Sequence, residues 1–313
     1  MSNHTTICID LAKEVFQVAI FNRAGKLKSN KEVSAKKMCT IVAQHPGADI
    51  FMEACGSAHY WGRRFSREGH KVGLIPPHIA AKYRAGNKND SNDAVAIYEA
   101  SKSPKLHCVS IRTLVQQDIA TLHKFREGYK KERNQIANRI RGFAREYGII
   151  FPLGINALRK KVPEALEDAD NELTTVSRKI LFELSEQLVR VIDLMAVATK
   201  EIELFSKSIE PCQRLVALPG FSWICGSMLY AKLGTGEAFK RGRDASASIG
   251  VVPSHRGSGG KVKIGGITKR GDIYLRSLLI NGARSVVSNI RDKTDGLSCW
   301  IRKLLSPVGW ARI

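Results

Sequence analysis

The sequence predicts a mixed α/β domain, then a helical arm, then a mainly helical C-terminal domain. Short apolar runs rich in β-branched residues alternate with helical spacing at the N-terminal end. The middle of the chain is almost free of Pro and Gly over long runs, and beyond Arg214 helical segments are interrupted by glycines. We therefore expect domains at residues 1–112, 113–208 and 209–313.

The N-terminal stretch predicts a sheet. Three β-rich runs with a turn at Gly25 favour three consecutive antiparallel strands, and a helix follows that His45-Pro46-Gly47 ends. Two short buried strands come later. Antiparallel strands followed by helix–strand alternation predict a mixed sheet with helices on its faces. The predicted strands are Thr5–Ile9, Val15–Phe21, Leu27–Val33, Asp49–Met52 and His70–Ile75, and the predicted helix is Ala35–Gln44.

The middle stretch predicts two or three long helices that form an antiparallel, coiled-coil-like arm. Its apolar residues recur at every third or fourth position, and its charge is divided. Residues 123–161 carry eleven Lys and Arg against three Glu, whereas Glu164–Glu210 is dominated by acids. The acidic part is interpreted as a solvated face. The basic part favours contact with a nucleic-acid backbone over a merely solvated face, and its candidate residues are Arg139, Arg141 and Arg145.

In the last stretch, Leu215–Phe221 is typical of the turn in a helix-hairpin-helix element, where backbone N–H groups hold a phosphate. Ser222 stands where the second glycine of that motif is expected, so a simple helix–turn–helix packing unit is an equal alternative. Beyond a glycine-rich segment, Leu275–Val287 has the spacing of an amphipathic helix.

The charge balance indicates a polyanionic partner. The chain has 50 Lys and Arg against 29 Asp and Glu, a formal net charge of +21. Such an excess favours nucleic acid, because binding releases condensed counterions; a merely soluble basic protein or a membrane-surface binder is the alternative. No signal peptide or spanning apolar run is recognised, and the seven scattered cysteines are typical of reduced thiols. We expect a cytoplasmic protein, nucleoid-associated when bound to DNA.

Four acids suggest a metal site. Asp10 and Glu53 each close a predicted strand, and Asp90 and Asp93 share one face of a helix if that helix begins near Asp90. Carboxylates at the ends of central strands that face two more on a helix form an oxygen cage suited to Mg²⁺. Alternatively, Asp90 or Asp93 caps the helix and Asp10 simply ends its strand.

Ser258 is a second candidate for chemistry. It lies in a glycine-rich loop whose basic neighbours can hold a phosphate, and glycines allow close backbone approach. A serine needs a base or a metal to act as a nucleophile, and we expect its activation from the acidic cage. A phosphate-binding loop in which Ser258 only donates a hydrogen bond is the alternative. The candidate binding residues around it are Arg256, Lys261, Lys263, Lys269 and Arg270.

Several longer motifs resemble one family of transposases. They include Cys8-Ile9-Asp10-Leu11-Ala12-Lys13, Met52-Glu53-Ala54-Cys55-Gly56-Ser57-Ala58-His59-Tyr60-Trp61, Lys88-Asn89-Asp90-Ser91-Asn92-Asp93-Ala94, Ser258-Gly259-Gly260-Lys261, Gly265-Gly266-Ile267-Thr268-Lys269-Arg270-Gly271-Asp272, Tyr274-Leu275-Arg276 and Gly282-Ala283-Arg284. In order and over nearly the whole chain, they are similar to the DEDD transposases of bacterial insertion sequences, whose target is chosen by a structured bridge RNA.

The resemblance implies an RNase H-like (RuvC-like) N-terminal domain with Asp10, Glu53, Asp90 and Asp93 as the Mg²⁺-binding tetrad. It also implies a C-terminal transposase domain in which Ser258 attacks DNA and forms a transient phosphoserine link. It further implies a homo-oligomer, a dimer or a tetramer, that shares sites between protomers and binds DNA and a guide RNA. Family members continue past Trp300 with a basic helical segment, and its loss here would weaken RNA binding or assembly.

We therefore expect an RNA-guided DNA recombinase that excises and inserts its own element. Two alternatives stay open: a metal-dependent junction nuclease in which water attacks, and an inactive nucleic-acid-binding remnant. A covalent protein–DNA adduct separates the first hypothesis from the other two.

Overall fold

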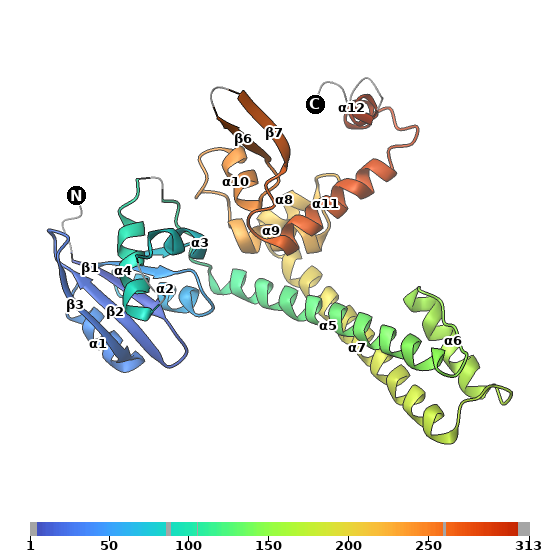
Figure 1. Ribbon diagram of the computed structural model, residues 1–313. Helices are drawn as coiled ribbons and strands as arrows, with labels where there is room; N and C mark the ends of the chain where they lie inside the picture. Colours follow the sequence, from blue (N-terminus) through green and yellow to red (C-terminus); the bar gives the residue numbers. More distant parts are fainter. Residues whose placement is uncertain (1–4, 86–88, 105, 259–260, 306–313) are drawn as a thin grey trace. The chain divides into compact units, whose positions relative to one another are not determined.

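The computed structural model describes residues 5–85, 89–104, 106–258 and 261–305, and only the backbone at positions 256, 258 and 262. Contacts divide the chain into two compact units, Met1–Leu114 and Val115–Ile313. Figure 1 shows the helices and strands of both units. Because this division yields two units, the three domains expected from the sequence stay a prediction.

The first unit is built on a five-stranded mixed sheet with the order β3-β2-β1-β4-β5. β1, β2 and β3 are antiparallel neighbours, and β4 and β5 continue the sheet in parallel with β1. All five predicted strands are confirmed to within a residue or two at their ends. They are β1 (Thr6–Leu11), β2 (Val15–Phe21), β3 (Leu27–Ser34), β4 (Asp49–Glu53) and β5 (Lys71–Ile75).

Helices cover both faces of this sheet. α1 (Ala35–Ala43) and α2 (Ala58–Arg67) bury Met38, Trp61 and Phe65 against one face. α4 (Asp90–Ser101) buries Ala94 and Ile97 against the other face. A short helix, α3 (Pro77–Ala80), and a 3₁₀ turn, η1 (Ala81–Tyr83), lead from β5 toward α4. The sheet is thus buried on both sides, as the predicted mixed α/β architecture requires.

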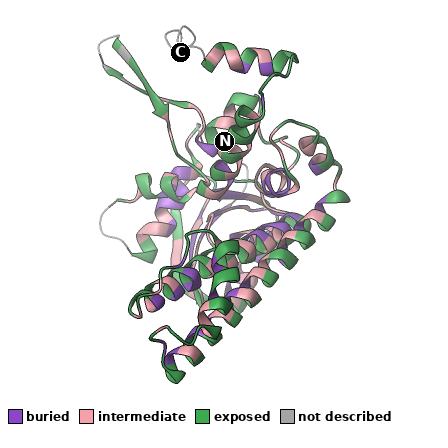
Figure 2. Ribbon diagram, turned by 90° about the vertical axis from the view of Figure 1, so that its right-hand side faces the viewer, coloured by how far each residue is buried: buried purple, intermediate pink, exposed green. Residues whose placement is uncertain are grey.

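Two long helices dominate the second unit. α5 (Leu114–Arg145) and α7 (Thr175–Lys207) contain 32 and 33 residues, and α6 (Ile155–Glu167) lies between them in sequence. They run side by side with their buried residues along the shared seam (Figure 2). The seam holds Ile136 and Ile140 from α5 and Leu181, Leu184 and Leu188 from α7. The predicted long helices are confirmed, while a true coiled coil stays a prediction.

Five shorter helices follow α7 in the described part of the chain, and α8 and α9 contact α7 directly. They are α8 (Glu210–Val216), α9 (Trp223–Leu233), α10 (Gly242–Ile249), α11 (Ile273–Ser288) and α12 (Gly296–Leu305). The turn between α8 and α9 packs closely against α11. A Cβ at Gly220 would lie 2.9 Å from the carbonyl oxygen of Gly282, which is too close for a side chain. This contact gives Gly220 a packing role, and phosphate binding by the turn stays a prediction.

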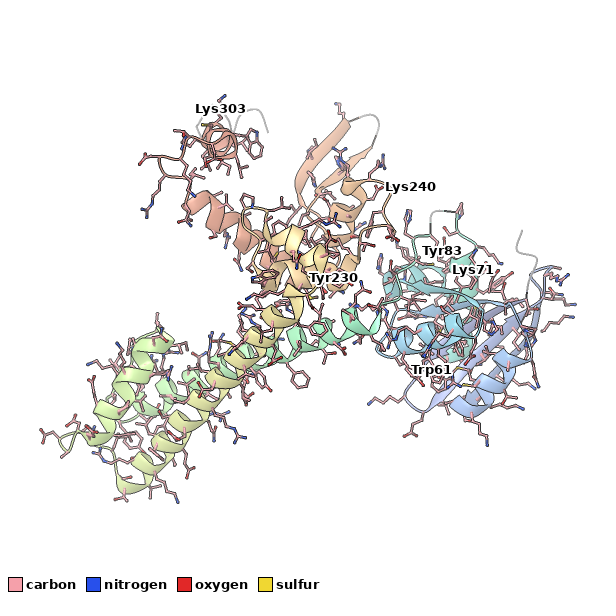
Figure 3. The ribbon with its side chains drawn as sticks, turned by 180° about the vertical axis from the view of Figure 1, so that it is seen from behind. Trp61, Lys71, Tyr83, Tyr230, Lys240 and Lys303 are labelled. Atoms are coloured by element: carbon pink, nitrogen blue, oxygen red, sulfur yellow. The ribbon has the colours of Figure 1, made fainter. Side chains whose placement is uncertain are left out.

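A polar network joins the arm to these short helices. His123 on α5 is 1% exposed, and its ring nitrogens hydrogen-bond to Ser227 Oγ on α9 at 2.9 Å and Tyr274 Oη on α11 at 3.0 Å. Nearby, the Gln116 amide donates to the carbonyl oxygen of Tyr230, which is labelled in Figure 3. Burial, with the nearby charge of Arg126 as the smaller cause, lowers the pKa of His123 to about 4.

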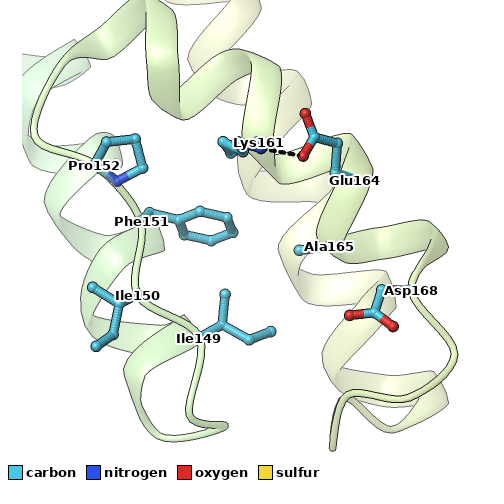
Figure 4. Close-up of a pocket in the computed structure, with 8 residues that line it drawn as sticks. All are labelled: Ile149, Ile150, Phe151, Pro152, Lys161, Glu164, Ala165 and Asp168. Carbon is cyan, nitrogen blue, oxygen red and sulfur yellow. Dashed lines mark hydrogen bonds and ion pairs between the residues drawn. The ribbon is translucent and has the colours of Figure 1, made fainter.

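A pocket of about 520 Å³ lies at the end of the arm, between the α5–α6 connection and α6 (Figure 4). Its wall combines Ile149 and Phe151 with the Lys161–Glu164 ion pair. Its lining is mostly apolar and carries no nucleophile. Among the described residues, no helix combines the length and hydrophobicity needed to cross a membrane.

The neutral His123 makes stability depend on pH. The unfolded chain takes up a proton near pH 6.5, whereas the folded chain resists protonation of this ring until about pH 4. The stabilisation from His123 is therefore complete above pH 6.5 and is lost as the pH falls toward 4. We expect His123→Gln to lower the free energy of unfolding by about 1–2 kcal/mol at pH 7.5. This deficit should shrink in urea titrations at pH 5, whereas the exposed His78→Gln should show neither effect; a deficit that grows at pH 5 would contradict the assignment.

Candidate functional site

Three carboxylates meet at one edge of the first unit. Oxygens of Asp10, Asp90 and Asp93 lie within 4.8 Å of one another. Asp10 is near the end of the central strand β1, and the other two occupy the first turn of α4. The predicted clustering of these three residues is confirmed. We call them the acidic cluster.

Glu53 lies beside this cluster without belonging to it. It ends β4, which pairs in parallel with β1, and the last paired residues before the two acids are Ile9 and Met52. The Glu53 charge acts on Asp10 and raises its pKa. Among the described residues, the carboxylate oxygens that all lie within 4.8 Å of one another belong to Asp10, Asp90 and Asp93 and do not include those of Glu53. Its predicted role as a fourth ligand stays a prediction.

The helix that carries two of the acids is capped by another residue. α4 begins at Asp90, as expected, and the Asn89 side chain accepts a hydrogen bond of 2.7 Å from the Asn92 backbone. The alternative that Asp90 or Asp93 is the N-cap is therefore wrong, because Asn89 already satisfies the free donor. Both aspartates remain in the first turn, where the helix dipole favours negative charge.

A chain of neutral side chains ties the start of α4 to the sheet. Gln17 lies opposite Asp10 across the β1–β2 ladder, and its amide donates to Asn30 Oδ1 at 2.6 Å. Asn30 in turn donates to the carbonyl oxygen and hydroxyl of Ser91, at 3.1 and 2.8 Å. Ser91 follows Asp90 directly, so these bonds fix the helix end that carries the acids. Sequence reasoning missed Gln17 and Asn30, because their spacing carries no motif.

One cation also contacts the cluster. The guanidinium of Arg84, which follows η1, forms an ion pair with Asp93. Both side chains are largely buried, at 24% and 12% exposure, so the pair lies in a partly desolvated setting where charge interactions are stronger. Arg84 offsets part of the negative charge that the three carboxylates bring together.

The electrostatics of Asp10 reflect this crowding. Burial is the largest cause that raises the pKa of Asp10, to about 6, and the charges of Asp93, Glu53 and Asp90 add to it. A carboxyl that resists ionisation because it is buried and like charges surround it is stabilised in its charged form by a bound cation. The donor set is entirely carboxylate oxygen, which suits a hard divalent ion.

The predicted serine loop is a β-hairpin. β6 (Pro253–Ser258) and β7 (Lys261–Ile267) pair antiparallel, with Ser258 opposite Lys261 at the tip. The expectation of an irregular loop here is wrong: Val262, Ile264 and Ile267 favour a strand, and the backbone hydrogen bonds of a ladder are formed despite the glycines. The side chains of Ser258 and Arg256 and the residues Gly259 and Gly260 lie outside the described part.

The base of this hairpin is closely packed. Gly250 and Gly271 adopt φ of +82° and +80°, and a Cβ on either would collide with the backbone of Arg270 or Ser248. Arg276 on α11 is 7% exposed and donates through Nη1 to the carbonyl oxygens of Ile249 and Arg270, at 3.0 and 2.9 Å. These carbonyls precede and follow the hairpin, so Arg276 joins its two ends.

The other predicted binding residues fall into two groups. Lys261, Lys263, Lys269, Arg270, Arg139 and Arg145 are exposed. Arg141 is half-buried and donates to the carbonyl oxygens of Pro152 and Leu153, at 2.9 and 2.5 Å. Arg141 therefore has a structural contact that the sequence did not indicate. Nucleic-acid binding by all of these residues stays a prediction.

Comparisons with known proteins cover most of the chain. Residues 7–149 match a family model described as transposase, and residues 212–296 match the transposase IS116/IS110/IS902 family. The chain is 34% identical to the transposase for insertion sequence element IS1111A of Coxiella burnetii, over 97% of this chain and 84% of that one. It is 34% identical to a probable family 20 transposase of Pseudomonas aeruginosa, over 97% and 90%. It is 33% identical to the transposase for element IS1328 of Yersinia enterocolitica, over 98% and 91%.

Asp10→Asn should raise the melting temperature in metal-free buffer. Because the folded pKa of about 6 lies above the usual value of 3.8 for an aspartate, the folded chain binds the proton first as the pH falls. The charged Asp10 therefore destabilises the fold fully above pH 6, and this penalty disappears toward pH 4. Melting curves in EDTA should show the largest gain for Asp10→Asn at pH 7–8 and almost none at pH 4. Glu14→Gln is the matched control, and a loss of stability by Asp10→Asn at pH 8 would contradict this electrostatic assignment.

Gly271→Ala should disturb the base of the hairpin. An alanine at φ +80° costs about 1–2 kcal/mol in backbone strain, and its Cβ would also collide with the Ser248 carbonyl. We expect a lower melting temperature and faster proteolysis between Val251 and Ile267. Gly266→Ala is the control on the same hairpin, because a Cβ there meets nothing within 4 Å. Equal melting temperatures for the two variants would show that the hairpin base is loosely packed.

Proposed function

The chain belongs to the IS116/IS110/IS902 family of DEDD transposases, and from this we propose that it cuts and rejoins DNA with a divalent metal at the acidic cluster and Ser258 as nucleophile. The observation that carries the metal part of the proposal is the meeting of Asp10, Asp90 and Asp93 oxygens within 4.8 Å. The hairpin position of Ser258, between basic residues, supports the nucleophile.

The residues of the cluster fit Mg²⁺. Asp10, Asp90 and Asp93 would hold the ion, and Glu53 on the neighbouring strand would complete the tetrad. When bound, such an ion neutralises charge on a phosphate and lowers the pKa of an attacking hydroxyl. The chain supplies the geometry: Asn30 fixes the start of α4 through Ser91, and Arg84 holds Asp93 in place.

The serine step conserves phosphodiester bonds. The bond from Ser258 Oγ to phosphorus forms while the bond from phosphorus to one deoxyribose oxygen breaks. The serine proton passes to a basic group, and the departing oxygen takes up a proton. Attack by a second strand's hydroxyl on the phosphoserine reverses these steps and regenerates the serine. Cutting and rejoining therefore need no external energy source.

The remaining positive residues support binding of nucleic acid. Lys261, Lys263, Lys269 and Arg270 are exposed on and beside the hairpin, and Arg139 and Arg145 are exposed on α5. Exposed cations of one sign gain affinity for phosphates by counterion release. We include in the proposal DNA at the hairpin, a guide RNA as the second nucleic acid, and a homo-oligomer.

Ser258→Ala tests the nucleophile. With nicked suicide DNA, the wild type should form a protein–DNA adduct that survives denaturing electrophoresis. Ser258→Ala should bind the DNA with unchanged affinity and form no adduct, because the hydroxyl is the atom that bonds to phosphorus. Ser254→Ala, on the same strand, should retain the adduct.

Two outcomes would replace the proposal. Metal-dependent cleavage by Ser258→Ala without any adduct would make the chain a junction nuclease in which water attacks. Binding without cleavage or adduct in the wild type would make it an inactive nucleic-acid-binding protein.

A further inference from the structure

One side of the sheet in the first unit is strongly basic, and the acidic cluster lies on the other side. The acidic cluster lies at the edge covered by α4, whereas α1 and α2 cover the other face. On that second side, α1, α2 and their capping residues contain one acid, Glu68. It forms an ion pair with Arg64, whose Nε lies 3.0 Å from its Oε1. We call this side the basic face. Its cations are Lys31, Lys36, Lys37, Arg63, Arg64 and Arg67.

The placement of these cations follows from the fold. Lys31 pairs across β2–β3 with Val18, whose side chain belongs to the core under α1 and α2. Directly opposed residues in a ladder project to the same face, so Lys31 joins the basic face. On α2 the buried stripe is formed by Ala58, Trp61, Gly62 and Phe65, which leaves its arginines on the outer side.

An aromatic ring lies among the cations. Tyr60 is 50% exposed, and its ring packs edge-on against Trp61 at 5.0 Å (Trp61 is labelled in Figure 3). The Arg64 guanidinium lies 5.6 Å from the Trp61 ring centre, so Trp61 contacts both Tyr60 and a cation of the basic face. An exposed tyrosine with cations around it is the usual arrangement for stacking an unpaired base while neighbouring phosphates are neutralised.

The DNA strand at the acidic cluster cannot also occupy the basic face. A sheet and the helix layers on its two sides separate them, and each layer is roughly 10 Å thick. A base-paired duplex would in addition offer no free base to Tyr60. The basic face therefore suits a second strand, one that has unpaired nucleotides.

We propose that the basic face binds an unpaired segment of RNA, with its phosphates on the cations of α1 and α2 and one base stacked on Tyr60. This inference rests on the proposed function in that it needs an RNA partner. It adds where on the first unit that partner binds and in which form.

Charge removal tests the phosphate contacts. The variant Lys36→Gln, Lys37→Gln, Arg67→Gln removes three exposed charges from the basic face, and Arg23→Gln, Lys26→Gln, Lys28→Gln removes three from the β2–β3 hairpin. Binding of a short unstructured RNA to the full chain is measured at several salt concentrations. The first variant should lower the slope of log K against log[salt] by about 2, at about 0.7 for each single-strand contact, and the second should leave it unchanged.

Tyr60 tests the stacking contact. Tyr60→Ala should weaken binding of the same RNA roughly tenfold or more, because one base–aromatic stack is lost. Tyr60→Phe keeps the ring and should bind as the wild type does. Equal melting temperatures of the two variants confirm that the loss is not one of folding.

The outcomes separate this inference from the proposed function. If the wild type binds no RNA, the RNA partner of the proposed function fails, and this inference fails with it. If the wild type binds RNA and both basic-face tests leave binding unchanged, only the inference is overturned. Weaker binding of duplex DNA by the triple variant, with RNA binding intact, also overturns it and makes the face a DNA surface.

Discussion

Repulsion between carboxylates is the constraint on which the first unit depends. Carboxylate oxygens of three acids lie within 4.8 Å of one another, and burial of Asp10, together with the charges of its acidic neighbours, raises its pKa. A fold tolerates such a site only if other contacts hold the acids together. Here the parallel pairing of β1 with β4, the N-terminal dipole of α4 and the Arg84–Asp93 pair do so. The Gln17–Asn30–Ser91 bonds add a neutral link that does not compete with a bound cation.

In the second unit, the constraint is that the glycine-rich hairpin β6–β7 must be held in one position. Gly257, Gly265 and Gly266 lie in β6 and β7, and glycine loses more conformational freedom on folding than any other residue. The base of the hairpin offsets this cost. Gly250 and Gly271 have positive φ and leave no room for a Cβ, and the buried Arg276 donates to the carbonyl oxygens of Ile249 and Arg270 on either side of the hairpin. The Gly220–Gly282 contact secures α11 itself. Gly271, Arg276 and Gly282, which belong to the motifs shared with the transposase family, thus hold the base of the hairpin and α11 in place.

Much of the fold was predictable from local pattern, and the exceptions have identifiable causes. The strands were found because their apolar alternation is strong, and the start of α4 was found from the spacing of its acids. The buried stripe of α2 was missed because its four small or aromatic members lie among arginines. The β6–β7 hairpin was missed because glycine has low strand propensity, and only pairing makes those residues a strand. Arg84 pairs with Asp93 of the acidic cluster and Asn30 bonds to Ser91 beside it, through tertiary contacts that no sequence spacing encodes.

The net charge of +21 is not spread evenly over the first unit. A uniformly positive chain would attract nucleic acid everywhere and would not distinguish the strand to be cut from a strand that is only held. In the first unit the acidic cluster and Arg84 lie on the α4 side of the sheet, whereas the cations of the basic face lie on the α1 and α2 side. Phosphate at the acidic edge is disfavoured unless a divalent ion is present, whereas phosphate on the opposite face is favoured without one. Under the proposed function, cutting at the acidic cluster would therefore require a divalent ion, whereas binding of a polyanion on the basic face would not.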